Sequence, residues 1–129
     1  MRIRKIDPLP LSSTYIDHNR NQLNLDIDNI LNLKTLYTNV DNSLKSKLDE
    51  LQAEIAISEP DIICLTETKP KNGQVPDKEL LNLNSYDLFL NPAFNDEDTR
   101  GVCIYAKQYL NARAVETDIT KSFKDSAWL

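Results

Sequence analysis

Glycine is scarce in this sequence, with Gly73 and Gly101 the two glycines among 129 residues. Loops that cradle phosphate groups with backbone N–H groups need several closely spaced glycines directly after a strand. The composition therefore argues against an unrelated doubly wound domain that binds a nucleotide through a glycine-rich loop.

Histidine and cysteine are also rare: the sequence has one histidine, His18, and two cysteines, Cys64 and Cys103. A structural zinc site needs four such ligands and a disulfide framework needs several cysteine pairs, so the sequence argues against both. Each cysteine lies inside an apolar run, which predicts reduced, buried thiols. No neighbour would orient His18 as a base, so we expect a surface histidine.

Long apolar stretches are also missing. No apolar run approaches the roughly 20 residues that a membrane span requires. Asp7, Pro8 and Pro10 interrupt the stretch in which a signal peptide would need an apolar core. The sequence has no Asn-x-Ser/Thr sequon. We therefore expect an intracellular protein without membrane partners, with nuclear and cytoplasmic locations both open.

Positive charge is in deficit, since 15 Lys and Arg face 20 Asp and Glu and the formal net charge is −5. This balance argues against a protein that holds nucleic acid by bulk positive charge. It does not exclude a nuclease, because the carboxylates that bind a catalytic metal are themselves acidic and phosphate contacts can be few.

The sequence predicts one domain behind a polar leader. Residues 1–30 are rich in Asn, Asp and Ser and predict a poorly ordered leader, although the alternation of Leu23, Leu25 and Ile27 leaves a short strand as an alternative. In residues 31–129 we expect strands at Leu31–Thr38, Asp61–Thr66, Tyr86–Leu90, Gly101–Ala106 and Ala112–Ile119, a helix that ends near Ser58, a helical turn at Lys78–Leu83, and a further element that begins at Phe123–Leu129.

The predicted helix carries one apolar stripe, formed by Leu44, Leu48, Leu51 and Ile55. It joins two apolar runs, so a parallel strand–helix–strand unit is expected, followed by an antiparallel hairpin. The continuous run from Ile62 to Leu65 is typical of a strand covered on both faces.

Polar residues follow both parallel strands at the edge where their carboxyl ends meet. Asn39 and Asp41 follow the first strand, and Glu67 follows the second. An amide and two carboxylates are ligands that Mg²⁺ accepts, with water completing its coordination. The alternative is that Asn39 and Asp41 form an Asx-turn or helix cap, and that Glu67 is an ordinary acid at a loop.

Three segments in this order resemble one known group of proteins. They are Thr38-Asn-Val-Asp41, Asp61-Ile-Ile-Cys-Leu-Thr-Glu-Thr-Lys69, and Arg100-Gly-Val-Cys-Ile-Tyr-Ala-Lys107, and the ending Phe123-Lys-Asp-Ser-Ala-Trp128 adds to them. Together they resemble the N-terminal portion of the endonuclease/exonuclease/phosphatase superfamily. Within that group, the sequence is most similar to the endonuclease domains of non-LTR retrotransposons, which accompany a reverse transcriptase.

The resemblance implies a Mg²⁺-dependent endonuclease, a hydrolase that cleaves phosphodiester bonds of DNA. It implies the opening part of a DNase I-like four-layer α/β sandwich, with a βαβ unit followed by a hairpin. Glu67 would then bind the metal and Asn39 would support it, with Asp41 placed in the same site. Lys69 and Arg100 would contact substrate phosphate, and for each of them an ordinary loop residue is the alternative.

The sequence departs from the family in its catalytic groups. The family's Gly-Asp-x-Asn and Ser-Asp-His motifs do not occur in these 129 residues, and His18 precedes the first domain strand. We therefore expect a truncated or fragmentary endonuclease domain that is inactive alone. The alternative is a non-enzymatic interaction module that keeps the βαβ core, with self-association through an exposed sheet face.

Overall fold

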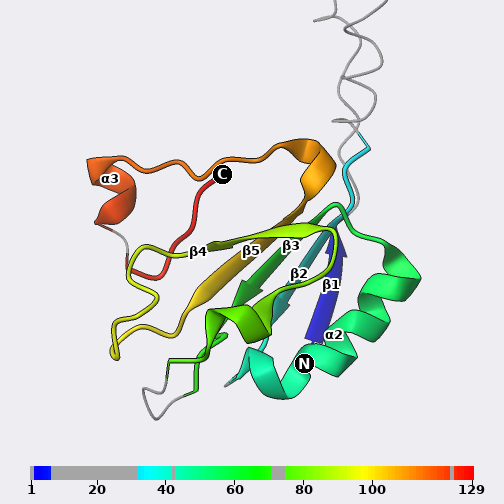
Figure 1. The fold of residues 1–129 in the computed structure, drawn as a ribbon, viewed down its shortest axis with the longest axis horizontal. Coiled ribbons are helices and arrows are strands. Elements are labelled where there is room, and N and C mark those ends of the chain that lie inside the picture. The colour runs from blue at the N-terminus through cyan, green and yellow to red at the C-terminus, as the bar shows by residue number, and fades with distance from the viewer. Residues whose placement is uncertain (1, 7–31, 42, 71–74, 123) are drawn as a thin grey trace, which may run out of the picture.

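The computed structural model describes residues 2–6, 32–41, 43–70, 75–122 and 124–129, and statements below refer to these residues. Their elements, in chain order, are β1 (Arg2–Ile6), β2 (Thr35–Asn39), α2 (Leu44–Ser58), β3 (Ile62–Thr66), η2 (Lys78–Leu81), β4 (Tyr86–Leu90), β5 (Val102–Lys107), η3 (Gln108–Leu110) and α3 (Asp118–Lys121). Figure 1 shows them as a mixed α/β arrangement with the long helix α2 packed beside one sheet.

The sheet has five strands in the order β1-β2-β3-β5-β4. β2 and β3 are parallel neighbours, whereas β1 pairs with β2, β5 with β3, and β4 with β5 in antiparallel fashion. The predicted strand–helix–strand unit and the predicted antiparallel hairpin are therefore both confirmed.

The leader prediction is wrong for Arg2–Ile6, which form the edge strand β1 instead of poorly ordered chain. Backbone hydrogen bonding to β2 supplies the reason, because a strand edge pairs with any extended segment that reaches it. Most of the predicted leader, with His18 and the alternating Leu23, Leu25 and Ile27, lies outside the described residues. The first domain strand also begins later than predicted, at Thr35.

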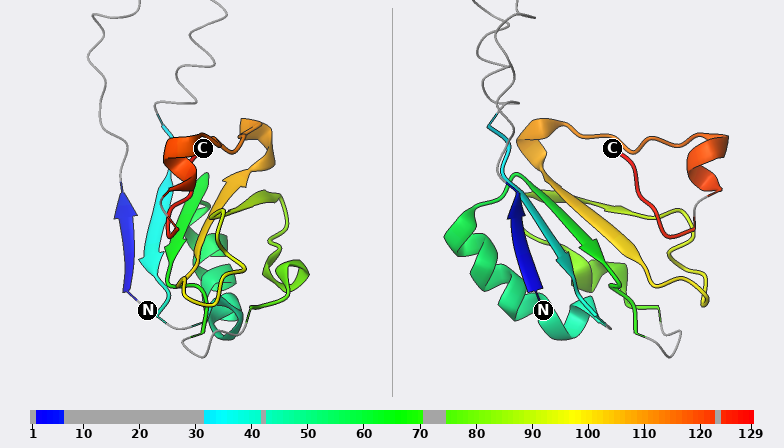
Figure 2. Two further views of the ribbon diagram at one scale, coloured as in Figure 1. Left: turned by 90° about the vertical axis from the view of Figure 1, so that its left-hand side faces the viewer. Right: turned by 180° about the vertical axis from the view of Figure 1, so that it is seen from behind.

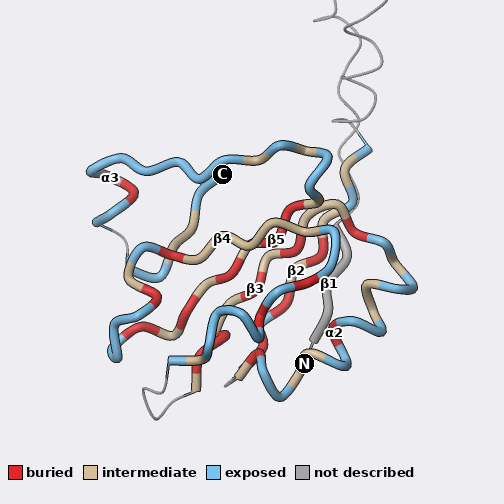
Figure 3. Tube along the Cα trace, in the orientation of Figure 1, coloured by how far each residue is buried: buried red, intermediate tan, exposed pale blue. Residues whose placement is uncertain are grey.

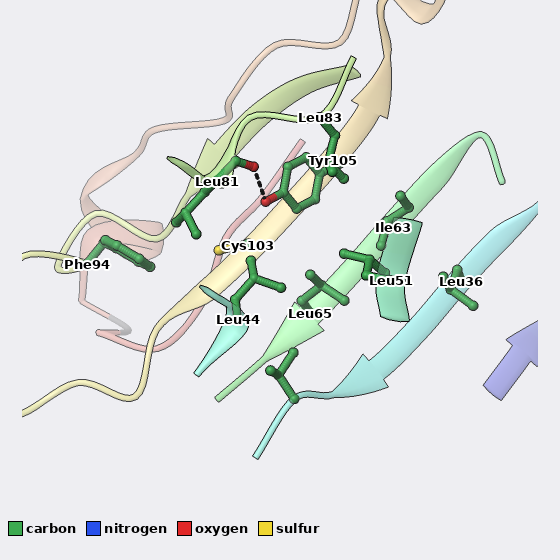
Figure 4. Packing of buried hydrophobic residues seen from close by; sticks show 11 residues of the cluster. Leu36, Leu44, Leu51, Ile63, Leu65, Leu81, Leu83, Phe94, Cys103 and Tyr105 are labelled. Carbon is green, nitrogen blue, oxygen red and sulfur yellow. Dashed lines mark hydrogen bonds between the residues drawn. The ribbon is translucent and has the colours of Figure 1, made fainter. Parts of the chain in front are cut away.

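The predicted helical stripe is the face that α2 turns toward the sheet. Leu44 and Leu51 are fully buried, and Leu48 and Ile55 are partly buried against the same core. Figure 4 shows Leu51 close to Ile63 and Leu65 of β3, between helix and sheet. Burial of each such side chain contributes about 1.5–3 kcal/mol before conformational entropy is counted. The packing therefore fixes the helix, and with it the strands that it connects.

The two faces of the sheet are covered unequally. On the helix face, residues such as Ile63 and Leu65 are buried, and η2 adds Leu81 to the same core. On the second face, Ile62, Cys64 and Thr66 are half-buried, so the prediction that β3 is covered on both faces is only partly confirmed. Figure 2 shows α2 and η2 on one side of the sheet, and Figure 3 shows the buried segments concentrated along the strands.

The segment after β5 differs from the prediction. Ala112–Ile119 does not form a strand; its first residues are irregular and its last two begin the short helix α3. The described residues between 123 and 129 form no helix or strand. Instead, the Val115 N–H donates to the Trp128 carbonyl at 2.9 Å, and both residues line a small cleft beside Phe89 of β4. A single hydrogen bond with apolar contact replaces the expected strand pairing.

Asp61 directly precedes β3, at the edge of the sheet opposite Glu67, and its side chain binds three neighbouring residues there. Its carboxylate accepts hydrogen bonds from the Lys34 backbone N–H at 2.8 Å and from the Tyr109 hydroxyl at 2.6 Å, and Lys107 Nζ lies 3.6 Å away. Partial burial opposes ionisation, but the hydrogen bonds from Tyr109 and Lys34 and the charge of Lys107 outweigh it. They hold the pKa of Asp61 below its ordinary value.

Asp61→Asn is expected to destabilise the fold by about 1–3 kcal/mol at pH 7. Because the folded-state pKa is lowered, this stabilisation is fully present above the unfolded-state value of about 3.9 and is lost as pH falls through the folded-state value. Urea unfolding of both proteins from pH 7 down to pH 3 should show the difference shrinking. Asp49→Asn, at an exposed position of α2, is the control. A difference that stays constant with pH would contradict the assignment.

Candidate functional site

The carboxyl ends of β2 and β3 meet at one edge of the sheet, as the parallel pairing requires. Asn39 is in register with Thr66, and the Val40 N–H donates to the Thr66 carbonyl at 2.9 Å. This pairing places Glu67 beside Asn39, whose Nδ2 donates to Glu67 Oε1 at 3.1 Å. The contact predicted between the ends of the two strands is therefore present.

The second carboxylate oxygen of Glu67 is bound by Arg100, which precedes β5. A guanidinium nitrogen of Arg100 donates to Glu67 Oε2 at 3.1 Å, and the two side chains are 38% and 36% exposed. An ion pair at this exposure is worth about 0–1 kcal/mol. Arg100 is thus part of the same site, paired with the Glu67 carboxylate.

The guanidinium of Arg100 is not fully satisfied by this pair. Its Nε is buried and has no hydrogen-bond acceptor among the described residues. A buried donor without an acceptor is unusual in folded proteins and requires an explanation, such as a bound group or a second arrangement of the side chain. Arg100 therefore has donor capacity that the pair with Glu67 does not use.

Asn39 also forms the Asx-turn that the sequence left open. The Asp41 N–H donates to Asn39 Oδ1 at 2.9 Å, and Asp41 adopts a left-handed backbone conformation with φ of 49°. The Asn39 amide therefore directs its nitrogen at Glu67 and its oxygen at the backbone of Asp41. Its described role is to orient the Glu67 carboxylate, and Asp41 is an exposed residue of the adjoining turn.

Glu67 itself has a left-handed backbone, with φ of 54°. This conformation costs a residue other than glycine about 1–2 kcal/mol. Hydrogen bonds on either side hold it, because the Thr66 carbonyl accepts from Val40 and the Thr68 N–H donates to the Gly101 carbonyl at 3.2 Å. Backbone strain of this kind is concentrated at functional sites, where the surrounding structure enforces it.

Lys69 does not lie where the predicted contact with substrate phosphate would place it. Its side chain is fully buried, and its Nζ donates to the Asp96 carbonyl and to Thr99 Oγ1, the latter at 3.2 Å. The ammonium also lies 5.6 Å from the centre of the Phe94 ring. Lys69 therefore fixes the loop between β4 and β5, which carries Arg100, and its role is structural.

Two residues that the sequence did not single out position Arg100. Asp125 Oδ1 accepts the backbone N–H groups of Arg100 at 3.0 Å and of Gly101 at 3.3 Å. Asn91, which is almost fully buried, accepts the Val102 N–H at 2.9 Å and donates to the Lys124 carbonyl. The C-terminal segment is thus tied to the loop that carries the arginine. No short sequence pattern signals contacts between residues so far apart in the chain.

Carboxylate oxygens at this edge are of the kind that binds a magnesium ion, but the positive charge of Arg100 lies against the main carboxylate. Glu67 and Asp41 offer carboxylate oxygens, whereas the Asn39 oxygen already accepts the Asp41 N–H. Mg²⁺ commonly takes one or two protein carboxylates with water for the rest. Within the described residues, no group of three or more His, Cys, Asp or Glu side chains gathers to hold a metal. Glu67 would therefore be the main ligand, and Arg100 already neutralises its charge.

Comparison of the chain with protein-family models, with curated proteins and with solved structures returned no match. Among the described residues, no helix has both the length and the apolar character needed to cross a membrane.

Proposed function

We propose that this chain is the N-terminal part of a Mg²⁺-dependent endonuclease domain of the endonuclease/exonuclease/phosphatase type, most similar to retrotransposon endonucleases, and that it does not cleave DNA alone. The observation that carries the proposal is the contact between Asn39 and Glu67 at the carboxyl ends of two parallel strands. An amide that orients a carboxylate at this edge is the arrangement that the motif order implies. The proposed fold is the opening part of a DNase I-like α/β sandwich.

In this proposal each residue has one task. Glu67 would hold the ion and Asn39 would fix the orientation of its carboxylate through the Nδ2 hydrogen bond. When bound, Mg²⁺ would supply charge stabilisation to the phosphate and to the attacking and leaving oxygens. Arg100 would bind phosphate oxygens through its planar fork of N–H donors. The 129 residues contain neither a Gly-Asp-x-Asn motif to position the nucleophile and the phosphate nor a Ser-Asp-His motif for the acid–base work, which supports inactivity of this chain alone.

A second candidate function is a non-enzymatic interaction module that keeps the βαβ core. The supporting observation is a half-buried row across the second face of the sheet, formed by Tyr37, Cys64, Ile104 and Phe89 in register. A partly uncovered row of this kind favours association with another chain or with a second copy. In such a module Glu67 would bind no metal, and its ion pair with Arg100 would neutralise its charge instead.

Titration with Mg²⁺ tests the metal site directly. Wild-type protein is expected to bind Mg²⁺ weakly, and Glu67→Gln should weaken binding by at least about tenfold, because it removes the charged ligand. Isothermal titration calorimetry measures both, with Glu50→Gln on the exposed side of α2 as a matched control. Equal affinity in wild type and Glu67→Gln would remove Glu67 from the site and favour the interaction module.

A nicking assay on supercoiled plasmid with Mg²⁺ tests the inactivity of this chain alone. Neither wild-type protein nor Glu67→Ala is expected to nick the plasmid. Nicking that depends on Glu67 would show that other groups, for example in a dimer, replace the missing acid–base residues. The coding sequence that follows the codon of Leu129 gives an independent check, because Gly-Asp-x-Asn and Ser-Asp-His motifs there would identify a nuclease fragment.

A further inference from the structure

The ion pair between Arg100 and Glu67 occupies the carboxylate that the proposed metal site needs. Arg100 donates to Glu67 Oε2 at 3.1 Å, while Asn39 donates to Oε1 at 3.1 Å. Both oxygens therefore already have a donor, and one of these donors carries a positive charge. A divalent cation that approaches Glu67 would be repelled by the guanidinium at close range.

The guanidinium can leave Glu67 without movement of the backbone beneath it. The Arg100 N–H is held by Asp125 Oδ1 at 3.0 Å, and the Arg100 carbonyl accepts the Lys69 N–H at 2.9 Å. Both anchors belong to the main chain of Arg100 and are independent of its side chain. The pair with Glu67 is partly exposed on both sides, so water can replace it at little cost.

Arg100 also retains capacity to bind an anion. Its buried Nε has no acceptor among the residues that the structure describes, and an arginine offers five N–H donors in a planar fork. A phosphate group presents oxygens that match this fork in pairs. A guanidinium released from Glu67 would stay at the same edge of the sheet, because its backbone is fixed there.

We propose that Arg100 is an exchangeable cation: it neutralises Glu67 until a divalent metal ion binds the carboxylate, and the released guanidinium then contacts a phosphate group of DNA. This inference rests on the proposed function, since it takes Glu67 as the metal ligand. It predicts that metal and DNA each strengthen the binding of the other, because both favour the released state of Arg100.

Titration with Mn²⁺, followed by the electron paramagnetic resonance signal of the free ion, tests the exchange on the full chain. Arg100→Gln should tighten Mn²⁺ binding about three- to tenfold, since it removes the competing charge. Arg100→Lys should bind like wild type. The matched control is Arg113→Gln, which removes the same charge from an exposed position, and it should stay within about twofold of wild type. Circular dichroism would establish that each variant is folded.

The outcomes separate the inference from the proposed function. Unchanged or weaker Mn²⁺ binding in Arg100→Gln, with binding still dependent on Glu67, would overturn the exchange and leave the metal site standing. Mn²⁺ binding that is equal in wild type and Glu67→Gln would overturn the metal site itself. Tightening in Arg113→Gln as large as in Arg100→Gln would reduce the effect to net charge and overturn the exchange.

Fluorescence anisotropy of a labelled 12-base-pair DNA duplex, with and without Mg²⁺, tests the proposed contact of the released Arg100 with a DNA phosphate. Wild-type protein should bind the duplex more tightly when Mg²⁺ is present, and Arg100→Gln should lose most of that gain. An equal gain in both proteins would show that the metal contacts DNA without help from Arg100, which would overturn the phosphate contact.

Discussion

Gly101→Ala is expected to destabilise the protein by about 2–5 kcal/mol, a large fraction of the roughly 5–15 kcal/mol typical of a domain. Gly101 has φ of 79°, where an alanine is strained by about 1–2 kcal/mol. A Cβ at this position would lie 2.6 Å from Thr68 Oγ1 and 2.7 Å from Lys69 Cγ. Lys69 is fully buried and cannot move aside freely, so overpacking adds about 1–3 kcal/mol.

Urea unfolding followed by circular dichroism measures this loss. Asn111→Ala is the control, because Asn111 is exposed and also has a left-handed backbone, with φ of 49°. That variant should show the backbone strain alone, about 1 kcal/mol. A Gly101→Ala protein within 1 kcal/mol of wild type would mean that the backbone near Thr68 adjusts at small cost. The same change should also disturb the position of Arg100, the preceding residue.

Leu51→Ala should cost about 2–5 kcal/mol, because it leaves a cavity in the core between α2 and the sheet. Leu51 has no exposed surface, and Figure 4 shows it among the leucines and isoleucine of the helix face. Ile57→Ala, at a residue of the same helix that is 77% exposed, should change stability by no more than about 0.5 kcal/mol.

Urea midpoints of the two variants, measured side by side, check this prediction. Similar losses in Leu51→Ala and Ile57→Ala would contradict the described packing of α2 and place its apolar contact elsewhere. Because α2 joins β2, which ends at Asn39, to β3, which Glu67 follows, a loosened helix would also weaken the alignment of these two residues.

The part of the fold that local patterns specify was predicted from the sequence. The stripe from Leu44 to Ile55 required a helix with one buried face, and the apolar runs before Asn39 and Glu67 required strands. Short right-handed connections then leave few arrangements other than parallel neighbours. The contact between Asn39 and Glu67 follows directly from that pairing, which is why the centre of the candidate site could be predicted from the sequence.

The remaining features depend on contacts that local patterns do not encode. A lysine in a loop gives no sign that it will be buried, and the role of Lys69 depends on the carbonyl of Asp96, 27 residues away. Asp125 and Asn91 act in the same way, through hydrogen bonds to distant backbone groups. The strand Arg2–Ile6 does carry a local signal, because three of its five residues are basic and charged side chains are common on edge strands.

The position of β3 has a consequence for synthesis on the ribosome. One neighbour, β2, precedes it in the chain, but the other neighbour, β5, ends about 40 residues after it. At about 5–20 residues per second, translation of that interval takes about 2–8 s. During this time the backbone groups of β3 that β5 will bind have no partner strand. The growing chain therefore passes through a stage with an open apolar strand edge, when chaperone binding or association with a second nascent chain competes with correct folding.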